Sequence, residues 1–281
     1  MPTIVVLHTV LARPTPHQRS VLQRVAGAAD AVVVMSRTAA DRLLDGYLEN
    51  SSKVVVIAHG AHTRDRAFAP GPKPSSAVHA PLILSWGLLG PGKGLEWAID
   101  ALARLRDMAP GPRYLIAGQT HPKVLERDGE AYRESLMQRA TARGVAGMVR
   151  FDPAYRDPSS LSRLVHSADV VMMPYDSSEQ TTSGVLIEAI AALRPVVATR
   201  FPHALELLGG GSGLLVDHRD PVGIAAALRR VLTEPGLAAR MSAHAARIAP
   251  ALAWTAVAER YRTVAADLLA ARAQVEAGVP A

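Results

Sequence analysis

Small polar residues crowd the segment from Ser177 to Ser183, directly in front of an apolar stretch with helical spacing. The first N–H groups of a helix have no intrahelical partner, so Ser183 and Gly184 could present theirs to a phosphate. Glu188 follows about one turn later, where a carboxylate can accept hydrogen bonds from two hydroxyls of a ribose or sugar. The segment therefore predicts a site for a ligand with several oxygens.

Two further side chains in this segment suit sugar hydroxyls. Gln180 and Glu179 follow an apolar strand-like run, and an amide or a carboxylate at a strand end can hydrogen-bond a sugar. A purely structural interpretation stays open beside this one. In it, Thr182 or Ser183 caps the helix and Glu188 complements the helix dipole.

A glycine-rich loop at 87–94 is the second candidate, with Gly87, Gly90, Gly92 and Lys93 between a strand-like run and a helical stretch. Glycines let backbone N–H groups approach an anion, and a lysine adds a full positive charge. The spacing fits neither a Walker loop nor the dinucleotide-binding G-x-G-x-x-G. Lysine is scarce in this chain, which favours a functional position over a flexible turn with a solvated lysine.

A third loop begins at Gly118 and continues through Gln119 and His121. It follows another strand-like run and could contact a base or a sugar, although an ordinary polar loop is an equal alternative. His59 and His62 lie close together in "HGAH", but no cluster of carboxylates accompanies them. The sequence therefore predicts no metal site.

These loops belong to an alternation of short apolar runs and amphipathic stretches. The runs are continuous rather than alternating, which is typical of a parallel sheet covered on both faces, so the fold class is α/β. The predicted strands are 3–8, 31–36, 53–58, 82–87, 114–118, 149–152, 169–174, 195–199 and 213–216. The predicted helices are 16–28, 37–48, 94–108, 130–143, 158–166, 184–193, 220–232 and 253–273.

A Pro-, Gly- and Ser-rich stretch suggests how the chain is divided. We expect a partial N-terminal Rossmann-like domain at 1–62, a linker at 63–80 and a complete C-terminal Rossmann-like domain at 81–252. The remaining residues, 253–281, are expected to form a helix that packs back across both parts. The first part has too few strands and helices for a whole doubly wound domain.

The composition excludes several function classes. The chain has 281 residues and no Cys, which excludes disulfides, thiolate catalysis and Cys-ligated zinc. Aromatic residues make up 4% and no charge run resembles a basic arm, so nucleic acid is not an expected partner. No apolar run approaches the roughly 20 residues that span a bilayer. The expected location is the cytoplasm, including the inner face of the membrane.

The order of the loops resembles the retaining family-4 glycosyltransferases of the GT-B architecture. The matching segments are "HG" ahead of the linker, "GLLGPGKG", "ADVVMMPY", "SGVLIEA", "RPVVAT" and "GLLV". The combination of "AGQTHP", "GEAYRESL" and "EQTTSGVL" looks closest to the mannosyltransferase-like branch. The resemblance covers nearly the whole chain.

The resemblance implies transfer of a sugar from a nucleotide diphosphate donor to a hydroxyl acceptor with retention, in polysaccharide or glycolipid synthesis. It implies GDP-mannose as the donor, with a UDP-sugar as the alternative, a glycan or lipid-linked acceptor and no metal or other cofactor. Lys93, Gln180 and Glu179 would be the catalytic residues, and His8 would lie on the acceptor side. The donor-binding set would be Gly87, Gly90, Gly92, Lys93, Gly118, Gln119, His121, Thr182, Ser183, Gly184, Val185 and Glu188.

The sequence departs from the family at three points. Leu88 stands where the family has an Arg, and Gln180 stands where it has the first of two glutamates separated by seven residues. The acceptor-binding loops of the N-terminal domain are not expected in this chain. The alternative function is therefore a catalytically incomplete nucleotide-sugar binding domain that works with a partner chain. A nucleotide-sugar epimerase is a weaker alternative.

Overall fold

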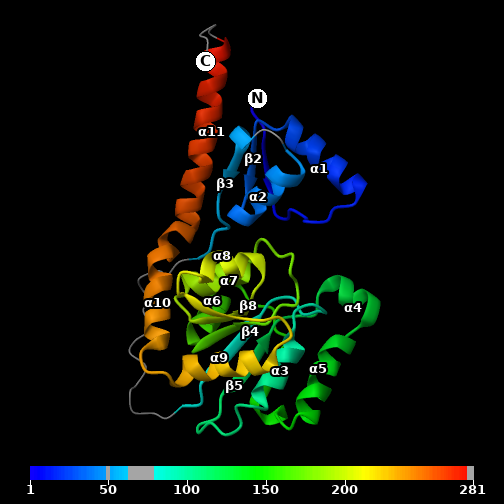
Figure 1. The fold of residues 1–281 in the computed structure, drawn as a ribbon, viewed down its shortest axis with the longest axis vertical. Helices are drawn as coiled ribbons and strands as arrows, with labels where there is room; N and C mark the ends of the chain where they lie inside the picture. Colours follow the sequence, from blue (N-terminus) through cyan, green and yellow to red (C-terminus); the bar gives the residue numbers. More distant parts are fainter. Residues whose placement is uncertain (49–50, 63–78, 277–281) are drawn as a thin grey trace.

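The computed structural model describes residues 1–48, 51–62 and 79–276, which form two parallel sheets with helices around them (Figure 1). The smaller sheet has the strand order β1-β2-β3. Its elements are β1 (Ile4–Leu7), α1 (Pro16–Ala28), β2 (Ala31–Val34), α2 (Arg37–Gly46) and β3 (Val54–Val56).

The larger sheet has six strands, all paired in parallel. Its strands are β4 (Leu82–Trp86), β5 (Arg113–Ala117), β6 (Val149–Asp152), β7 (Val170–Met173), β8 (Val196–Thr199) and β9 (Gly213–Val216). Its helices are α3 (Leu95–Leu102), α4 (Pro122–Asp128), α5 (Ala131–Ala142), α6 (Pro158–Ser167), α7 (Gly184–Ala191), α8 (Pro202–Leu208), α9 (Pro221–Thr233) and α10 (Leu237–Ile248).

The α/β class is confirmed, and each predicted strand is present in the described residues. Local signals explain the accuracy at α1, where Thr15 and Gln18 form a capping box and Pro16 occupies the first helical position. Helices α4, α8 and α10 were not predicted. The first two have only seven residues each, too few for a periodic apolar pattern to show.

Buried side chains fill both faces of the larger sheet. Helices α3, α5 and α9 cover one face, where Ile99, Leu136 and Leu228 belong to one buried cluster. On the other face, Leu186 of α7 and Ala204 of α8 belong to a second cluster. The sheet is therefore a covered layer, and only its edges and strand ends can present polar groups.

The last helix, α11 (Trp254–Glu276), connects the two sheets (Figure 1). It begins beside the larger sheet and runs along the smaller one, where Val257 packs with Val33 of β2 and Ile57. Helices α1 and α2 cover the opposite face of that sheet. The predicted linker lies mostly outside the described residues, because 63–78 are not among them, so the domain boundaries stay a prediction.

The strand order of the larger sheet identifies where a ligand would bind. Read along the sheet, β6-β5-β4-β7-β8-β9 is the doubly wound order 3-2-1-4-5-6. The strand order reverses between the parallel strands β4 and β7, because β5 and β6 are added on one side of β4 and β7 to β9 on the other. Such sheets bind ligands outside the carboxyl ends of the strands at this point. The glycine-rich loop follows β4 and the polar segment follows β7, so the two predicted loops lie side by side at the switch point.

No helix among the described residues is long and apolar enough to cross a membrane.

Candidate functional site

Two glycines allow the loops at the switch point to touch. A Cβ on Gly94 would lie 1.8 Å from the carbonyl oxygen of Pro174, and the φ of Gly94 is 64°. A Cβ on Gly118 would lie 2.0 Å from the carbonyl oxygen of Gly87. Any side chain at these positions would collide with a backbone atom, so glycine is required. The loops after β4, β5 and β7 are thereby held in contact.

Lys93 is held at this junction without a carboxylate partner among the described residues. Its Nζ lies 4.5 Å from the ring centroid of Tyr175, which is a cation–π contact. Burial lowers the pKa of Lys93 because the ammonium loses water. A partly desolvated cation gains most from an anion bound beside it, and this favours the predicted role of Lys93 towards a diphosphate.

Helix α7 begins at Gly184 with Ser183 as its N-cap. The Ser183 hydroxyl accepts a hydrogen bond from the N–H of Leu186 at 3.3 Å, as the structural interpretation of this segment expected. The N–H of Ser183 donates to Nδ1 of His203 at 2.9 Å, so the prediction that this N–H assists a phosphate is wrong. Among the described residues, the N–H groups of Gly184 and Val185 meet no acceptor and stay candidates.

The two side chains predicted at the sugar point in different directions. The carboxylate of Glu179 lies 3.2 Å from Nη1 of Arg42 on α2, whose guanidinium also donates to the Glu179 carbonyl oxygen at 3.0 Å. The amide of Gln180 donates to the carbonyl oxygen of Thr182 at 3.2 Å. Glu179 therefore joins the segment to the smaller sheet's helix, while Gln180 stabilises the turn before α7.

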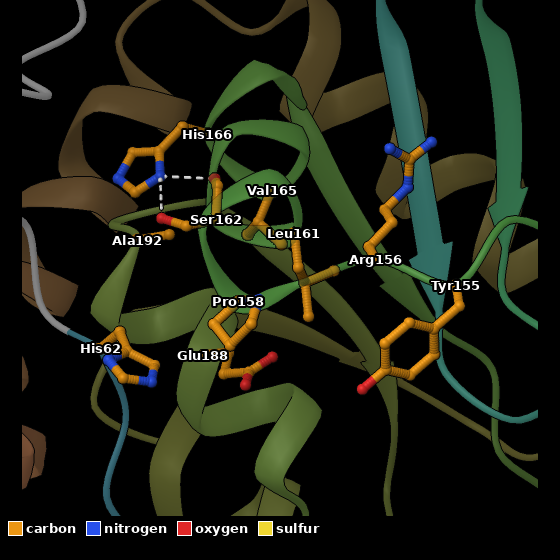
Figure 2. A pocket seen from close by; sticks show the side chains of 10 residues that line it. All are labelled: His62, Tyr155, Arg156, Pro158, Leu161, Ser162, Val165, His166, Glu188 and Ala192. Carbon is orange, nitrogen blue, oxygen red and sulfur yellow. Dashed lines mark hydrogen bonds between the residues drawn. The ribbon is translucent and has the colours of Figure 1, made fainter.

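Glu188 points into a cavity of about 330 Å³, with His62 on one side and Tyr155 on the other (Figure 2). Nε1 of Trp86 donates to the Glu188 carboxylate at 3.3 Å. Burial raises the pKa of Glu188, while the Trp86 hydrogen bond and the charges of His59 and His62 oppose that rise. A half-buried carboxylate with an open cavity before it can accept hydrogen bonds from ligand hydroxyls.

A second cavity of about 160 Å³ adjoins the first, since Tyr155, Arg156 and Leu161 line both. Its other walls include Gly87 and Gln119, from the loops after β4 and β5. Glu188 therefore borders the first cavity and two of the predicted loops border the second, with three lining residues shared between the two. A flat ring could enter the second cavity while a ribose meets Glu188 in the first.

Two of the residues predicted for the site, His121 and His8, lie outside the two cavities. His121 is the N-cap of α4, where its Nδ1 accepts a hydrogen bond from the N–H of Lys123 at 3.2 Å. His8 is exposed just beyond the end of β1, on the smaller sheet. Neither lines the two cavities beside Glu188. Among the described residues there is no group of three or more potential metal ligands.

The sequence reasoning missed Tyr155 and Arg156, which line both cavities, and Arg42, which pairs with Glu179. Tyr155 and Arg156 follow β6, so the rule that ligands lie beyond strand ends could have found them. Arg42 belongs to α2 on the smaller sheet, and no local signal relates it to residue 179.

Replacing Glu188 with Gln is expected to weaken nucleotide binding and to stabilise the empty protein. A charge-assisted hydrogen bond contributes about 1.5–3 kcal/mol, so the dissociation constant should rise roughly 10- to 150-fold. The unfolding free energy at neutral pH should rise, because the variant no longer buries a carboxylate that prefers to be neutral. Titration calorimetry and urea unfolding measure the two effects.

Glu126→Gln on the exposed face of α4 is the matched control and should change neither quantity. A Glu188→Gln protein that binds nucleotide like the wild type would remove Glu188 from the site.

His203 should make the protein less stable in acid. Burial lowers the pKa of His203 to about 4 from 6.5, with the charge of His59 in the same direction and Glu206 opposing. As the pH falls from 6.5 towards 4, the unfolded chain binds a proton that the folded chain does not. The unfolding free energy should therefore lose about 3 kcal/mol in this window. Urea unfolding of wild type and His203→Asn, compared pH by pH, isolates this loss; parallel curves would contradict it.

Comparison with known proteins identifies relatives that cover most of the chain. A family model described as "Glycosyl transferases group 1" matches residues 80–234. The D-inositol 3-phosphate glycosyltransferase of Kineococcus radiotolerans is 30% identical over 273 residues, which cover 89% of this chain and 61% of that protein. The protein of the same name from Corynebacterium diphtheriae is 29% identical over 256 residues, covering 87% and 58%. The chain thus spans about three fifths of the length of these curated relatives.

Solved structures are similar in fold. Anabaena Alr3699/HepE in complex with UDP has a TM-score of 0.79 at 20% identity, covering 95% of this chain and 72% of that one. Sucrose-phosphate synthase from Thermosynechococcus elongatus has a TM-score of 0.75 at 23% identity, covering 95% and 68%. These neighbours have the GT-B fold, so the GT-B prediction is confirmed. None of these four proteins is named as a mannosyltransferase.

Proposed function

The chain belongs to the group 1 glycosyl transferases, and from this premise we propose that it transfers a sugar from a nucleoside diphosphate donor to a hydroxyl acceptor with retention. The observation that carries the proposal is the convergence of Lys93, the start of α7 and Glu188 at the switch point of the larger sheet. A cation, a helix N-terminus and a carboxylate beside a cavity are the groups that a sugar nucleotide needs.

Each part of the donor has a counterpart in this arrangement. The diphosphate would lie between Lys93 and the N–H groups of Gly184 and Val185, where the helix dipole and a full charge favour an anion. The ribose hydroxyls would donate to Glu188. The base would enter the smaller cavity beside Gln119 and Tyr155.

The chemistry depends on charge that develops as the sugar leaves. When the bond between the anomeric carbon and the diphosphate oxygen breaks, that oxygen gains negative charge. Lys93 and the start of α7 would lie beside this oxygen and would stabilise the charge that it gains in the transition state. Gln180 would hydrogen-bond the sugar rather than offer it negative charge, since an amide is neutral.

For the donor we favour a UDP-sugar over the GDP-mannose that the sequence resemblance implied. Three solved structures of one neighbour, Anabaena Alr3699/HepE, are complexes with UDP and glucose, UDP, or UDP-glucose, which supports uridine as the base. For the acceptor, the names of the curated relatives support a phosphorylated polyol such as inositol 3-phosphate. A glycan or a lipid-linked acceptor at a membrane surface is the alternative.

The test is a transfer assay with UDP-glucose, UDP-N-acetylglucosamine and GDP-mannose, each with and without inositol 3-phosphate. Release of UDP that depends on the acceptor, with a product whose anomeric configuration matches the donor by NMR, is the expected result. Release of GDP alone would restore the mannosyl assignment. Inversion of the anomeric carbon would contradict the proposed mechanism.

A second candidate is a binding domain that holds a nucleotide sugar without transferring it. The observation that favours it is the missing charge at two positions: Leu88 is exposed in the glycine-rich loop at 46%, and Gln180 replaces a carboxylate. This candidate predicts tight nucleotide binding with no turnover of any donor in the same assay.

A further inference from the structure

His203 makes two hydrogen bonds to the turn before α7, which consists of residues 180–183. The backbone N–H of His203 donates to the carbonyl oxygen of Gln180 at 3.3 Å, and Nδ1 of its ring accepts from the backbone N–H of Ser183 at 2.9 Å. The side chain is 1% exposed, at the start of α8. Because α8 packs against the larger sheet, these two bonds fix the turn to a rigid element.

The bond to Ser183 determines the protonation state of the ring. A backbone N–H can only donate, so Nδ1 must carry a lone pair, and the proton of the neutral ring lies on Nε2. Burial also lowers the pKa of His203 to about 4, which keeps the ring neutral near pH 7. Both the tautomer and the orientation of the imidazole are therefore set by its contact with the turn.

The turn has few other ties that could replace this contact. The hydroxyls of Thr181 and Thr182 are buried without hydrogen-bond partners. The Gln180 amide bonds to the Thr182 carbonyl within the turn itself. Arg42 bonds to Glu179, one residue before the turn. The side chain of Ser183 also hydrogen-bonds the Tyr175 side chain, whereas its backbone N–H is held by His203 of the neighbouring helix α8.

We propose that His203 is a positioning residue for the nucleotide-sugar donor, an inference that rests on the proposed function. By accepting from Ser183, it sets the direction in which the next two N–H groups, of Gly184 and Val185, meet the diphosphate. The bond to the Gln180 carbonyl comes from the backbone N–H of His203, so a substitution of the side chain tests the Ser183 contact alone. His203 acts through the turn and does not itself touch the reacting atoms.

Three substitutions of His203 separate the effect of losing the hydrogen-bond acceptor for Ser183 from the effect of losing side-chain volume. His203→Asn places an amide oxygen near the position of Nδ1 and can still accept from Ser183. His203→Gln places its polar group near the position of Nε2, and His203→Ala removes the acceptor. We expect the dissociation constant for UDP to rise about tenfold in the Gln and Ala variants. It should stay within about threefold of wild type in the Asn variant.

The experiment combines UDP calorimetry, steady-state kinetics and amide hydrogen exchange on the full chain, with urea unfolding to verify that each variant is folded. KM for the donor should rise in the Gln and Ala variants more than kcat falls, and exchange at Ser183 should become faster. The Asn variant should restore both. Equal behaviour of the Asn and Gln variants, or unchanged UDP affinity in the Ala variant, would overturn the inference.

Failure of the proposed function has a different signature. Wild-type protein that binds neither UDP nor GDP contradicts the donor site, and with it the role of His203 towards a donor. Slow exchange at Ser183 in wild type and fast exchange in His203→Ala would still confirm the contact between the two residues. The two failures are thereby distinguished in one set of proteins.

Discussion

Replacing Lys93 with alanine should lower kcat for sugar transfer by about 100- to 1,000-fold. The ammonium lies at the end of the glycine-rich loop, 4.5 Å from the Tyr175 ring, and no carboxylate among the described residues neutralises it. Leu88 lacks the second positive charge of the family pattern, so Lys93 carries more of the stabilisation of the leaving diphosphate. Steady-state kinetics at saturating donor measures the loss.

Lys123→Ala is the control, because Lys123 is an exposed lysine on α4 whose backbone N–H, and not its side chain, bonds to His121. It should leave kcat unchanged. Lys93→Arg should recover part of the rate, since the guanidinium keeps the positive charge but is planar and larger than the ammonium. A Lys93→Ala enzyme within about threefold of wild-type kcat would show that the diphosphate is neutralised elsewhere.

Replacing Gly94 with alanine should lower the unfolding free energy by about 2–5 kcal/mol. The left-handed backbone, at φ 64°, costs an alanine about 1–2 kcal/mol. The new Cβ would also lie 1.8 Å from the Pro174 carbonyl oxygen, and forced displacement in a packed region costs about 1–3 kcal/mol. Because Lys93 is the preceding residue, donor binding should weaken as well. Urea unfolding and UDP calorimetry measure the two effects.

Gly236→Ala separates backbone strain from collision. Gly236 is also left-handed, at φ 76° and ψ −8° against φ 64° and ψ 19° for Gly94, and a Cβ there would meet only the flexible end of the Arg240 side chain, 3.1 Å from Nη1. It should cost mainly the left-handed penalty of about 1–2 kcal/mol and leave UDP binding unchanged. Equal losses in the two variants would mean that the loops after β4 and β7 are not in contact at Gly94.

The sequence predicted the elements of the fold better than their arrangement. Strands such as β2 and β8 are continuous apolar runs, and this pattern alone indicates burial on both faces. The strand order depends on pairing between segments that are distant along the chain, such as Ile83 with Val170. Short helices such as α8 are determined by what they pack against, so no local periodicity shows them.

The candidate site was predicted in part. The glycine-rich loop and the start of α7 are local signals, because each needs particular residue types at fixed spacing. The bond from Ser183 to His203 and the ion pair of Glu179 with Arg42 join residues from different elements. The bond from Ser183 to His203 leaves the N–H groups of Gly184 and Val185, and not that of Ser183, available to a phosphate. Contacts of this kind arise from tertiary packing, so spacing along the chain does not reveal them.

The central claim is that the switch point of the larger sheet binds a nucleoside diphosphate. The most direct test is a thermal unfolding titration of wild type and Glu188→Ala with UDP, GDP and ADP. Ligand at 100 times its dissociation constant should add about 2.7 kcal/mol of stability. The account predicts a rise in Tm of several degrees with UDP, and a rise at the same UDP concentration that is much smaller in Glu188→Ala. No rise with any nucleotide, or an equal rise in both proteins, would contradict it.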